Sequence, residues 1–292
     1  MTARSEPTSD VVHLALPKGR METAVLALLN DAGIRVTFGR RGYRPSLSLE
    51  GFETKILKPQ NIVEMLHLGS RDIGFAGADW VAELGAELVE LLDTGLDPVG
   101  VVAAAAPAFA DGGLARAPFI VASEYQRLTR DWLERSGLQA TVVRSYGATE
   151  VFPPEDADCI VDNMATGETL RANGLVIVDE LMRSSTRLYA NPHALEQPAK
   201  RERIERLVLL LRSVLDARQR VMLEVNVPAD RLEAVIAVLP SMREPTMAPL
   251  HGDQGFAVKA AVPRRDLPRV IPEIKARGGT DIVVTALAQI VP

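Results

Sequence analysis

The 292-residue sequence predicts two α/β lobes followed by a smaller α+β domain. Three observations support this prediction. Apolar strand patterns alternate with amphipathic helix patterns through the first third of the chain. A Gly- and Ala-rich segment at residues 107–118 marks a change of composition before a second alternating region. Residues 220–292 then change pattern again, to the order strand, helix, strand, strand, helix, strand.

Composition narrows the class of protein. Hydrophobic residues make up 47% and charged residues 24% of the chain, which is ordinary for a soluble globular protein. The formal net charge of −5 gives no overall basic field for nucleic acid or an anionic membrane. No apolar run approaches the ~20 residues of a membrane-spanning helix. Residues 1–10 are polar, lack a signal-peptide core and are expected to be a disordered lead-in.

Cysteine and histidine usage argues against disulfides and a zinc site. The single cysteine, Cys159, lies in an apolar run, so we expect a buried structural thiol and a reducing, cytoplasmic setting. The histidines at positions 13, 67, 193 and 251 show no ligand spacing. A zinc site made by the protein is therefore not expected.

The first lobe is expected to contain a mostly parallel sheet, because its strands and helices alternate. Pro17 ends its first strand, and Pro59 can open its second helix. Glycines at the end of the last strand permit close backbone approach. The expected strands are residues 11–16, 54–57 and 72–77, and the expected helices are residues 21–29 and 62–68.

The second lobe follows a small apolar strand at residues 99–106. Residues 119–122, 124–135 and 140–144 form a plausible β-α-β unit. Residues 192–198 resemble a linker, and residues 200–220 predict a long helix. Its many arginines are expected to form a solvated or interface face. Its apolar stripe comprises Ile204, Leu207, Val208, Leu211 and Leu215.

The tail has the element order of a ferredoxin-like domain, β-α-β-β-α-β. Such domains bind ligands or assemble, so the fold alone does not decide the function. The expected strands are residues 221–227, 245–250, 255–262 and 281–285, and the expected helices are residues 229–239 and 266–277.

The most informative motif is DCIVDNMATGETLRANGL at residues 158–175. An apolar strand ends in Asp162, and a small loop with Thr166, Gly167 and Thr169 follows it. Glycine lets backbone N–H groups close around a phosphate, and threonine hydroxyls add donors. Acidic residues at the strand end can bind ribose hydroxyls or a Mg²⁺ carried by phosphates. The alternative is a strand that turns into a helix with Thr as its N-cap.

In their order along the chain, several motifs resemble the long form of ATP phosphoribosyltransferase, the family of the first enzyme of histidine biosynthesis. The resemblance covers residues 11–292, and the motif at residues 158–175 is its most specific part. The others are LALPKGR at 14–20, DIGFAGAD at 72–79, STRLYANP at 185–192, NVP at 226–228, PT at 245–246, PL at 249–250 and GGTDIVV at 278–284.

The resemblance implies a two-lobed catalytic core like a periplasmic binding protein, with substrates in the cleft. Lobe I would take residues 11–103 and 180–198, and lobe II residues 104–179. A linker helix at 199–219 would lead to a ferredoxin-like regulatory domain at 220–292. The implied reaction joins N1 of ATP to C1 of phosphoribosyl pyrophosphate (PRPP). The implied assembly is a homohexamer that exchanges with dimers and is inhibited by histidine.

The resemblance implies that Lys18, Arg20 and Asp162 are catalytic. Displacement at C1 develops oxocarbenium character and places negative charge on the departing pyrophosphate. The protein must therefore align two polyanions and neutralise charge, and it needs no nucleophile of its own. Lys18 and Arg20 can offer cations to phosphates, or can simply form a surface turn.

For PRPP, the implied binding residues lie in the motif at residues 158–175. Thr166, Gly167 and Thr169 would cradle the 5-phosphate. Asp162 and Asp158 would hold ribose hydroxyls or stabilise the cationic ring, although Asp158 could equally be a strand-edge acid. Mg²⁺ is expected on the substrate phosphates, and no metal site made by the protein is assigned.

Nucleotide and effector residues are implied in the same way. Gly19, Asp79 and Glu150 match nucleotide-binding positions. Asp79 could instead be an N-cap, and Glu150 a carboxylate at a helix start. Asn226 and Thr246 match positions near the family's effector pocket, or are plain strand residues.

The sequence departs from the family pattern at three places. Residues 58–62 read KPQNI where the family has Arg-Pro-x-Asp-Ile, although Asn61 can still cap a helix. Tyr125 is followed by Gln126 instead of proline, and residues 92–101 lack a common basic residue. These departures leave open a non-catalytic ligand sensor with the same cleft. A solute-binding protein of the same architecture is disfavoured by the motif at residues 158–175.

Overall fold

The computed structural model describes residues 10–39, 42–109, 113–115 and 118–292. The chain divides into two compact units. Unit 1 runs to Asn30 and from Ile34 to Arg206, and unit 2 comprises Asp31–Gly33 and Leu207–Pro292. The lead-in predicted for residues 1–10 lies outside the described residues except for Asp10.

Unit 1 is built on one eight-stranded sheet with the order β4-β1-β5-β10-β6-β9-β7-β8. Strands β4, β1 and β5 run parallel in one half, which is lobe I, and β9, β7 and β8 run parallel in the other, which is lobe II. The bounds are β1 (Val12–Pro17), β4 (Phe52–Leu57), β5 (Ile73–Gly77), β6 (Val89–Ala105), β7 (Phe119–Ser123), β8 (Ala140–Arg144), β9 (Cys159–Met164) and β10 (Val176–Ala190).

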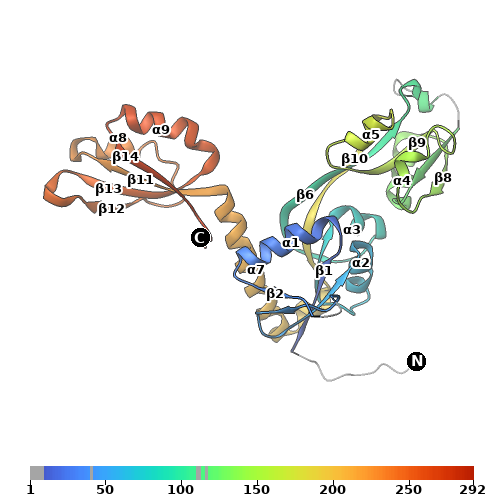
Figure 1. Cartoon of the computed structure of the whole chain (residues 1–292), viewed down its shortest axis with the longest axis horizontal. Helices are drawn as coiled ribbons and strands as arrows, with labels where there is room; N and C mark the ends of the chain where they lie inside the picture. Colours follow the sequence, from blue (N-terminus) through green and yellow to red (C-terminus); the bar gives the residue numbers. More distant parts are fainter. Residues whose placement is uncertain (1–9, 40–41, 110–112, 116–117) are drawn as a thin grey trace. The chain divides into compact units, whose positions relative to one another are not determined.

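Two long antiparallel strands, β6 and β10, join the lobes (Figure 1). The lobe boundaries predicted after residues 103 and 179 fall inside these strands. The strand expected at residues 99–106 is only the second half of β6. Its first half contains Asp93 and Asp97, which disfavour strands, but Arg187 of β10 pairs with Asp93 at 3.3 Å. Arg187 also supplies the positive charge that the sequence of this segment lacks.

Unit 1 has six helices among its described residues, of which α3 and α6 were not predicted. They are α1 (Arg20–Asp31), α2 (Pro59–His67), α3 (Ala78–Leu84), α4 (Gln126–Ser136), α5 (Glu168–Ala172) and α6 (Pro192–Glu196). Short elements complete the unit: β2 (Val36–Thr37), β3 (Ser46–Leu47), and the 3₁₀ turns η1 (Pro107–Phe109), η2 (Gly113–Ala115) and η3 (Thr149–Val151).

Two local predictions for these helices were wrong. The expected linker at residues 192–198 contains α6, which Asn191 caps by accepting a hydrogen bond from the His193 N–H at 2.9 Å. Asn61 does not cap α2, because Lys58 occupies the N-cap position and Pro59 opens the helix. The Asn61 amide instead donates to Glu64.

The helix α7 (Pro198–Gln219) begins in unit 1 and ends in unit 2. Its apolar stripe is close to the predicted one, with Ile204, Leu207 and Leu211 buried. Within unit 1 its first turn is fixed by Lys200, whose ammonium lies 2.8 Å from the Asp72 carboxylate. Both side chains are nearly buried.

Unit 2 confirms the predicted ferredoxin-like fold. Its strands follow the order β12-β13-β11-β14, and all pairs are antiparallel. The bounds are β11 (Arg220–Val227), α8 (Leu232–Ile236), β12 (Thr246–Pro249), β13 (Phe256–Pro263), α9 (Leu267–Ala276) and β14 (Thr280–Ala286). The helix expected at residues 229–239 is shorter, since a 3₁₀ turn, η4 (Ala229–Arg231), precedes α8. Two further 3₁₀ turns are η5 (His251–Asp253) and η6 (Arg264–Asp266).

Alternation along β11 separates the two faces of this sheet. Val221, Leu223, Val225 and Val227 are buried in a core that includes Val270 and Ile274 of α9. The residues between them, which are partly exposed, face the other side. Glu224 and Asn226 of β11 therefore lie on the open face of the sheet.

Candidate active site

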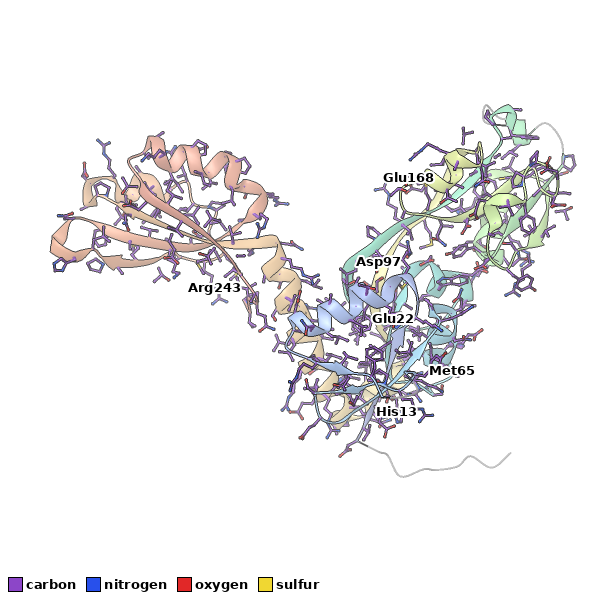
Figure 2. All side chains as sticks on the ribbon, in the orientation of Figure 1. His13, Glu22, Met65, Asp97, Glu168 and Arg243 are labelled. Carbon is purple, nitrogen blue, oxygen red and sulfur yellow. The ribbon has the colours of Figure 1, made fainter. Side chains whose placement is uncertain are left out.

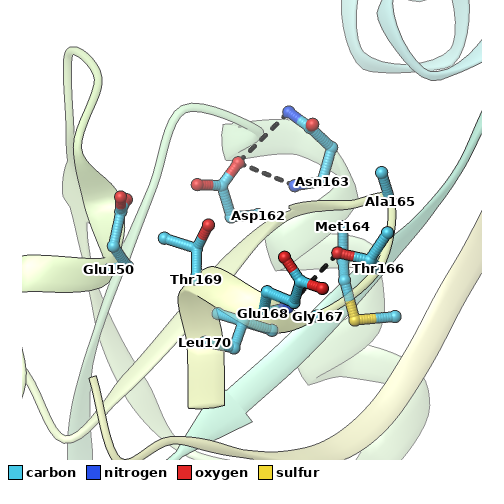
Figure 3. Close-up of a pocket in the computed structure, with 10 residues that line it drawn as sticks. All are labelled: Glu150, Asp162, Asn163, Met164, Ala165, Thr166, Gly167, Glu168, Thr169 and Leu170. Atoms are coloured by element: carbon cyan, nitrogen blue, oxygen red, sulfur yellow. Dashed lines mark hydrogen bonds between the residues drawn. The ribbon is translucent and has the colours of Figure 1, made fainter. Parts of the chain in front are cut away.

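A pocket of about 210 Å³ lies at the end of β9 in lobe II (Figure 3). It brings together five residues that the sequence predicts for the site: Glu150, Asp162, Thr166, Gly167 and Thr169. The others lining it are Asn163, Met164, Ala165, Glu168 and Leu170. The carboxyl end of β9 is where ligands of open α/β sheets usually bind.

The loop after β9 is preorganised by its own contacts. Gly167 has φ +74°, and a Cβ there would lie 3.0 Å from Met164 Sδ, so only glycine fits without strain. Arg171 donates to the Thr166 carbonyl at 3.2 Å, and the Asn173 amide donates to the Thr169 carbonyl at 2.9 Å. The main chain at Thr166 and Thr169 is thus fixed, and both residues line the pocket.

Asp162 stands at the inner end of this pocket. Its Oδ1 accepts a hydrogen bond from the Asn163 N–H at 2.7 Å. Burial, together with repulsion from Glu150 and Glu124, raises the pKa of Asp162 to about 6. The carboxylate is therefore mostly ionised at neutral pH, in surroundings that favour an approaching positive charge.

The predicted residues of lobe I do not line this pocket. Lys18, Gly19 and Arg20 are exposed where β1 passes into α1. Gly19 has φ +89°, which suits the tight turn, and the Lys18 N–H donates to the Leu57 carbonyl at 2.8 Å. The Lys18 ammonium lies 5.3 Å from the centroid of the Tyr43 ring. The two cations are thus presented at the carboxyl end of β1.

Asp79 is buried at the junction of the lobes. Its carboxylate accepts hydrogen bonds from the Ser184 hydroxyl at 2.6 Å and from the Tyr125 hydroxyl at 2.7 Å. A Cβ on Gly77 would lie 2.1 Å from Asp79 Oδ1, so glycine makes room for this carboxylate. The Asp79 carboxylate is therefore bound by Ser184 of β10 and by Tyr125 at the start of α4.

Further contacts connect α3 of lobe I to α4 of lobe II. Trp80 stacks on Tyr125 with ring centroids 4.8 Å apart. The Glu83 carboxylate accepts from the Arg127 and Leu128 N–H groups at 3.0 Å, and so caps the start of α4 from the other lobe. The lobes are therefore joined by packing and hydrogen bonds as well as by β6 and β10.

Two of the predicted site residues have neighbours that the sequence did not indicate. Asp158 does not line the pocket, because it lies at the opposite end of β9 from Asp162, roughly 13 Å along the strand. Its carboxylate accepts from the Ile120 N–H at 2.9 Å, which is the strand-edge alternative. Glu150, grouped with nucleotide residues, instead shares the pocket of Asp162. The 3₁₀ turn η3 carries it there.

Several residues at the site were missed from the sequence. Asn163 lines the pocket, and its amide donates to the Tyr125 hydroxyl at 3.1 Å. Tyr125 was noted only for lacking a following proline, and Ser184 carried no signal. These three residues come from β9, the start of α4 and β10, so only the fold brings them together.

Cys159 is buried, as predicted, and burial raises the pKa of its thiol to about 12. Within the described ranges, no three His, Cys, Asp or Glu side chains gather in a way that could hold a metal ion. In the same ranges, no helix is both long and apolar enough to cross a membrane.

The tail has a pocket of its own on the open face of the sheet, of about 380 Å³. Asn226 and Thr246, predicted near an effector site, both line it. The Asn226 amide donates to Asp281 at 3.0 Å, and Lys259 pairs with Glu224 at 2.7 Å. The pocket therefore contains hydrogen-bond donors and acceptors, and it has both positively and negatively charged side chains.

Comparison with known proteins gives consistent results. The family model described as ATP phosphoribosyltransferase matches residues 58–213, and the one described as HisG, C-terminal domain, matches residues 217–289. The ATP phosphoribosyltransferase of Pelotomaculum thermopropionicum is 35% identical over 96% of this chain and 99% of its own length. That of Chlorobium phaeovibrioides is 36% identical over 93% of this chain and 95% of its own length.

A solved structure is similar as well. A chain of the ATP phosphoribosyl transferase (HisG:HisZ) complex from Thermotoga maritima aligns with a TM-score of 0.63 and 25% identity. The alignment covers 70% of this chain and 99% of that one. Taken with the matches over nearly the full length, these findings show that the chain belongs to the ATP phosphoribosyltransferase family.

Proposed function

We propose that the chain transfers the phosphoribosyl group of PRPP to N1 of ATP and releases pyrophosphate, as the first step of histidine biosynthesis. The observation that carries this proposal is the pocket of lobe II, in a chain of this family. A threonine- and glycine-containing loop and an ionised carboxylate stand together there. A phosphorylated sugar needs both.

Chemically, the reaction is a displacement at C1 of the ribose. The bond from adenine N1 to C1 forms while the bond from C1 to the pyrophosphate oxygen breaks. The Thr166 and Thr169 hydroxyls donate to the 5-phosphate and fix the sugar. Asp162 stabilises the positive charge that develops on the ring, because its carboxylate is partly desolvated. Lys18 and Arg20 offset the charge of the departing pyrophosphate.

Mg²⁺ belongs to the proposal as an ion bound mainly by substrate. It usually keeps several waters and takes one or two carboxylates plus substrate phosphates. Asp162 and Glu150, both at the pocket, are oxygen donors of the kind it requires. When bound, the ion would neutralise pyrophosphate charge.

Regulation and assembly are further parts of the proposal, and they rest on the resemblance to the family. We propose that histidine inhibits the enzyme from the pocket of Asn226 and Thr246, that the enzyme is a cytoplasmic homohexamer exchanging with dimers, and that Gly19 lies near the nucleotide. The mixed donors and acceptors of that tail pocket suit an amino acid.

The test is chromatographic detection of phosphoribosyl-ATP from purified protein with ATP, PRPP and Mg²⁺, with and without histidine. We expect turnover that histidine suppresses. Absence of turnover, together with a thermal shift by histidine or nucleotide, would instead identify a non-catalytic sensor. That result would overturn the proposal.

A variant pair locates the PRPP site. Thr169→Ala should raise the KM for PRPP by about one to two decades and change ATP binding less, because one charged hydrogen bond is lost. Thr141→Ala removes an exposed hydroxyl of β8 as the matched control and should change neither. Equal loss for both substrates in Thr169→Ala would contradict the assignment of this loop.

A further inference from the structure

A pocket in unit 2 is lined mainly by arginines, and none of its lining residues has been given a role above. Its volume is about 410 Å³. It shares no residue with the tail pocket of Asn226 and Thr246. The residues that line it are Arg218, Gln219, Arg220, Pro263, Arg264 and Arg265.

Strand pairing brings these arginines together. Strand β11 begins at Arg220 directly opposite Pro263, where the antiparallel strand β13 ends. Arg218 precedes this point at the end of α7, and Arg264 and Arg265 follow it in η6. Pro263, with its φ fixed near −60°, turns the chain there. Four arginines therefore line one pocket at this corner of the sheet.

Only two of the four arginines have a carboxylate partner among the described residues. Arg218 pairs with Asp31 at 2.8 Å, and Arg265 lies 3.8 Å from Asp266. Arg220 and Arg264 form no ion pair with any described residue. Guanidinium groups remain charged at physiological pH. This corner therefore has an excess of two positive charges, although the whole chain has a net charge of −5.

We propose that this pocket binds a diphosphate group, either free or as part of a nucleotide's polyphosphate. Each guanidinium presents a planar fork that matches two phosphate oxygens. A diphosphate has enough oxygens and charge to engage several forks at once, whereas a single carboxylate or monophosphate engages fewer. The volume falls within the range of small-ligand pockets, roughly 300–1,000 Å³.

The proposal goes beyond the transfer reaction, because none of these arginines belongs to the pocket of lobe II. An anion held here would bridge the end of α7 and the turn between β13 and α9. Its binding can therefore be measured independently of turnover. A negative result in the transferase assay would not contradict diphosphate binding at this pocket. Absence of diphosphate binding would likewise not contradict the proposed transferase activity.

The experiment is calorimetric titration of the full chain with sodium diphosphate at low salt. Wild type should show a binding component that weakens at least about tenfold in the R220Q/R264Q double variant, because two charge-assisted contacts are lost. Circular dichroism checks that the variant is folded, and transferase activity without diphosphate should be unchanged. Arg264→Lys keeps the charge without the fork and should give an intermediate affinity.

Arg243→Gln is the matched control, since Arg243 is an exposed arginine of unit 2 outside this pocket (Figure 2). Arg243→Gln should leave the affinity for diphosphate unchanged. Competition by ATP but not by AMP would support diphosphate as the recognised group and a nucleotide as one source. Absence of competition by ATP would identify free diphosphate as the ligand. The proposal is overturned if wild type binds no diphosphate, if the double variant binds it equally well, or if AMP competes equally.

Discussion

The Tyr125 hydroxyl donates a 2.7 Å hydrogen bond to Asp79 and so joins the start of α4 in lobe II to the first turn of α3 in lobe I. Both side chains are buried, and burial together with the Asp79 charge raises the pKa of Tyr125. The same hydroxyl accepts from Asn163, the neighbour of Asp162. The junction of the lobes is thus connected directly to the pocket proposed to bind PRPP.

Tyr125→Phe should reveal this connection. The change keeps the ring stacked on Trp80 but removes one partner from the buried Asp79 carboxylate. Leaving such a group short of a hydrogen bond should cost about 1–3 kcal/mol of unfolding free energy. We also expect kcat/KM for PRPP to fall, because Asn163 loses its acceptor. Denaturant unfolding and steady-state kinetics measure the two effects.

Tyr43→Phe provides the control, because Tyr43 is 59% exposed. It should change the stability by less than about 0.5 kcal/mol. If Tyr125→Phe were as stable and active as wild type, the junction would have no part in holding Asp162.

Asp162→Asn should separate stability from activity. The raised pKa means that, between about pH 4 and pH 6, the folded protein holds a proton that the unfolded chain releases. The unfolding free energy therefore falls as pH rises through this window. Asparagine does not titrate, so the variant does not lose this stability as the pH rises. It should therefore be more stable than wild type at pH 7, by about 1–2 kcal/mol, and should show no gain in stability near pH 4.

Thermal unfolding at both pH values, together with phosphoribosyl transfer at pH 7, tests this prediction. Transfer should fall by at least about tenfold, because the charge facing the ring is lost. Asp156→Asn changes an exposed carboxylate nearby and should alter neither property. A variant less stable than wild type at pH 7 would contradict the electrostatic environment described for Asp162.

Gly167→Ala, compared with Gly137→Ala, distinguishes a change in the shape of the pocket loop from the backbone strain that both substitutions cause. Gly167 and Gly137 both have positive φ, +74° and +65°, so alanine should cost each about 1–2 kcal/mol. Only at Gly167 does the new Cβ meet a neighbour, Met164 Sδ at 3.0 Å, whereas Gly137 has open space. We expect a raised KM for PRPP in Gly167→Ala alone. A similar KM change in Gly137→Ala would point to general destabilisation.

The sequence predicted those parts of the fold and site that depend on neighbours in the chain. Strand β9 and the loop with Thr166, Gly167 and Thr169 follow from local pattern and glycine chemistry. Asp158 does not line the pocket, because it precedes β9 whereas the pocket lies at the carboxyl end of that strand. The first half of β6 was missed because its acidic and glycine residues are stabilised only by pairing with β10.

Long-range contacts account for the rest. Tyr125 and Asp79 are 46 positions apart, and Ser184 and Asp79 are 105 apart. Their partnership exists only because α3, β10 and the start of α4 meet at one junction. A buried tyrosine hydroxyl and a buried carboxylate each require a partner, but a single sequence does not show which one.

Lys200→Met should destabilise unit 1 more than any substitution above. The Lys200 ammonium and the Asp72 carboxylate form a buried pair at 2.8 Å, which fixes the first turn of α7 beside the strands β1 and β5. Removing the cation leaves Asp72 with the backbone N–H of His13 as a remaining donor, at 2.7 Å. An uncompensated buried charge costs about 3–5 kcal/mol. Adding Asp72→Asn should recover most of that loss, because the amide carries no charge and its oxygen can still accept from His13. Urea unfolding of both variants measures the coupling, and additive losses would show that the pair does not act as a unit.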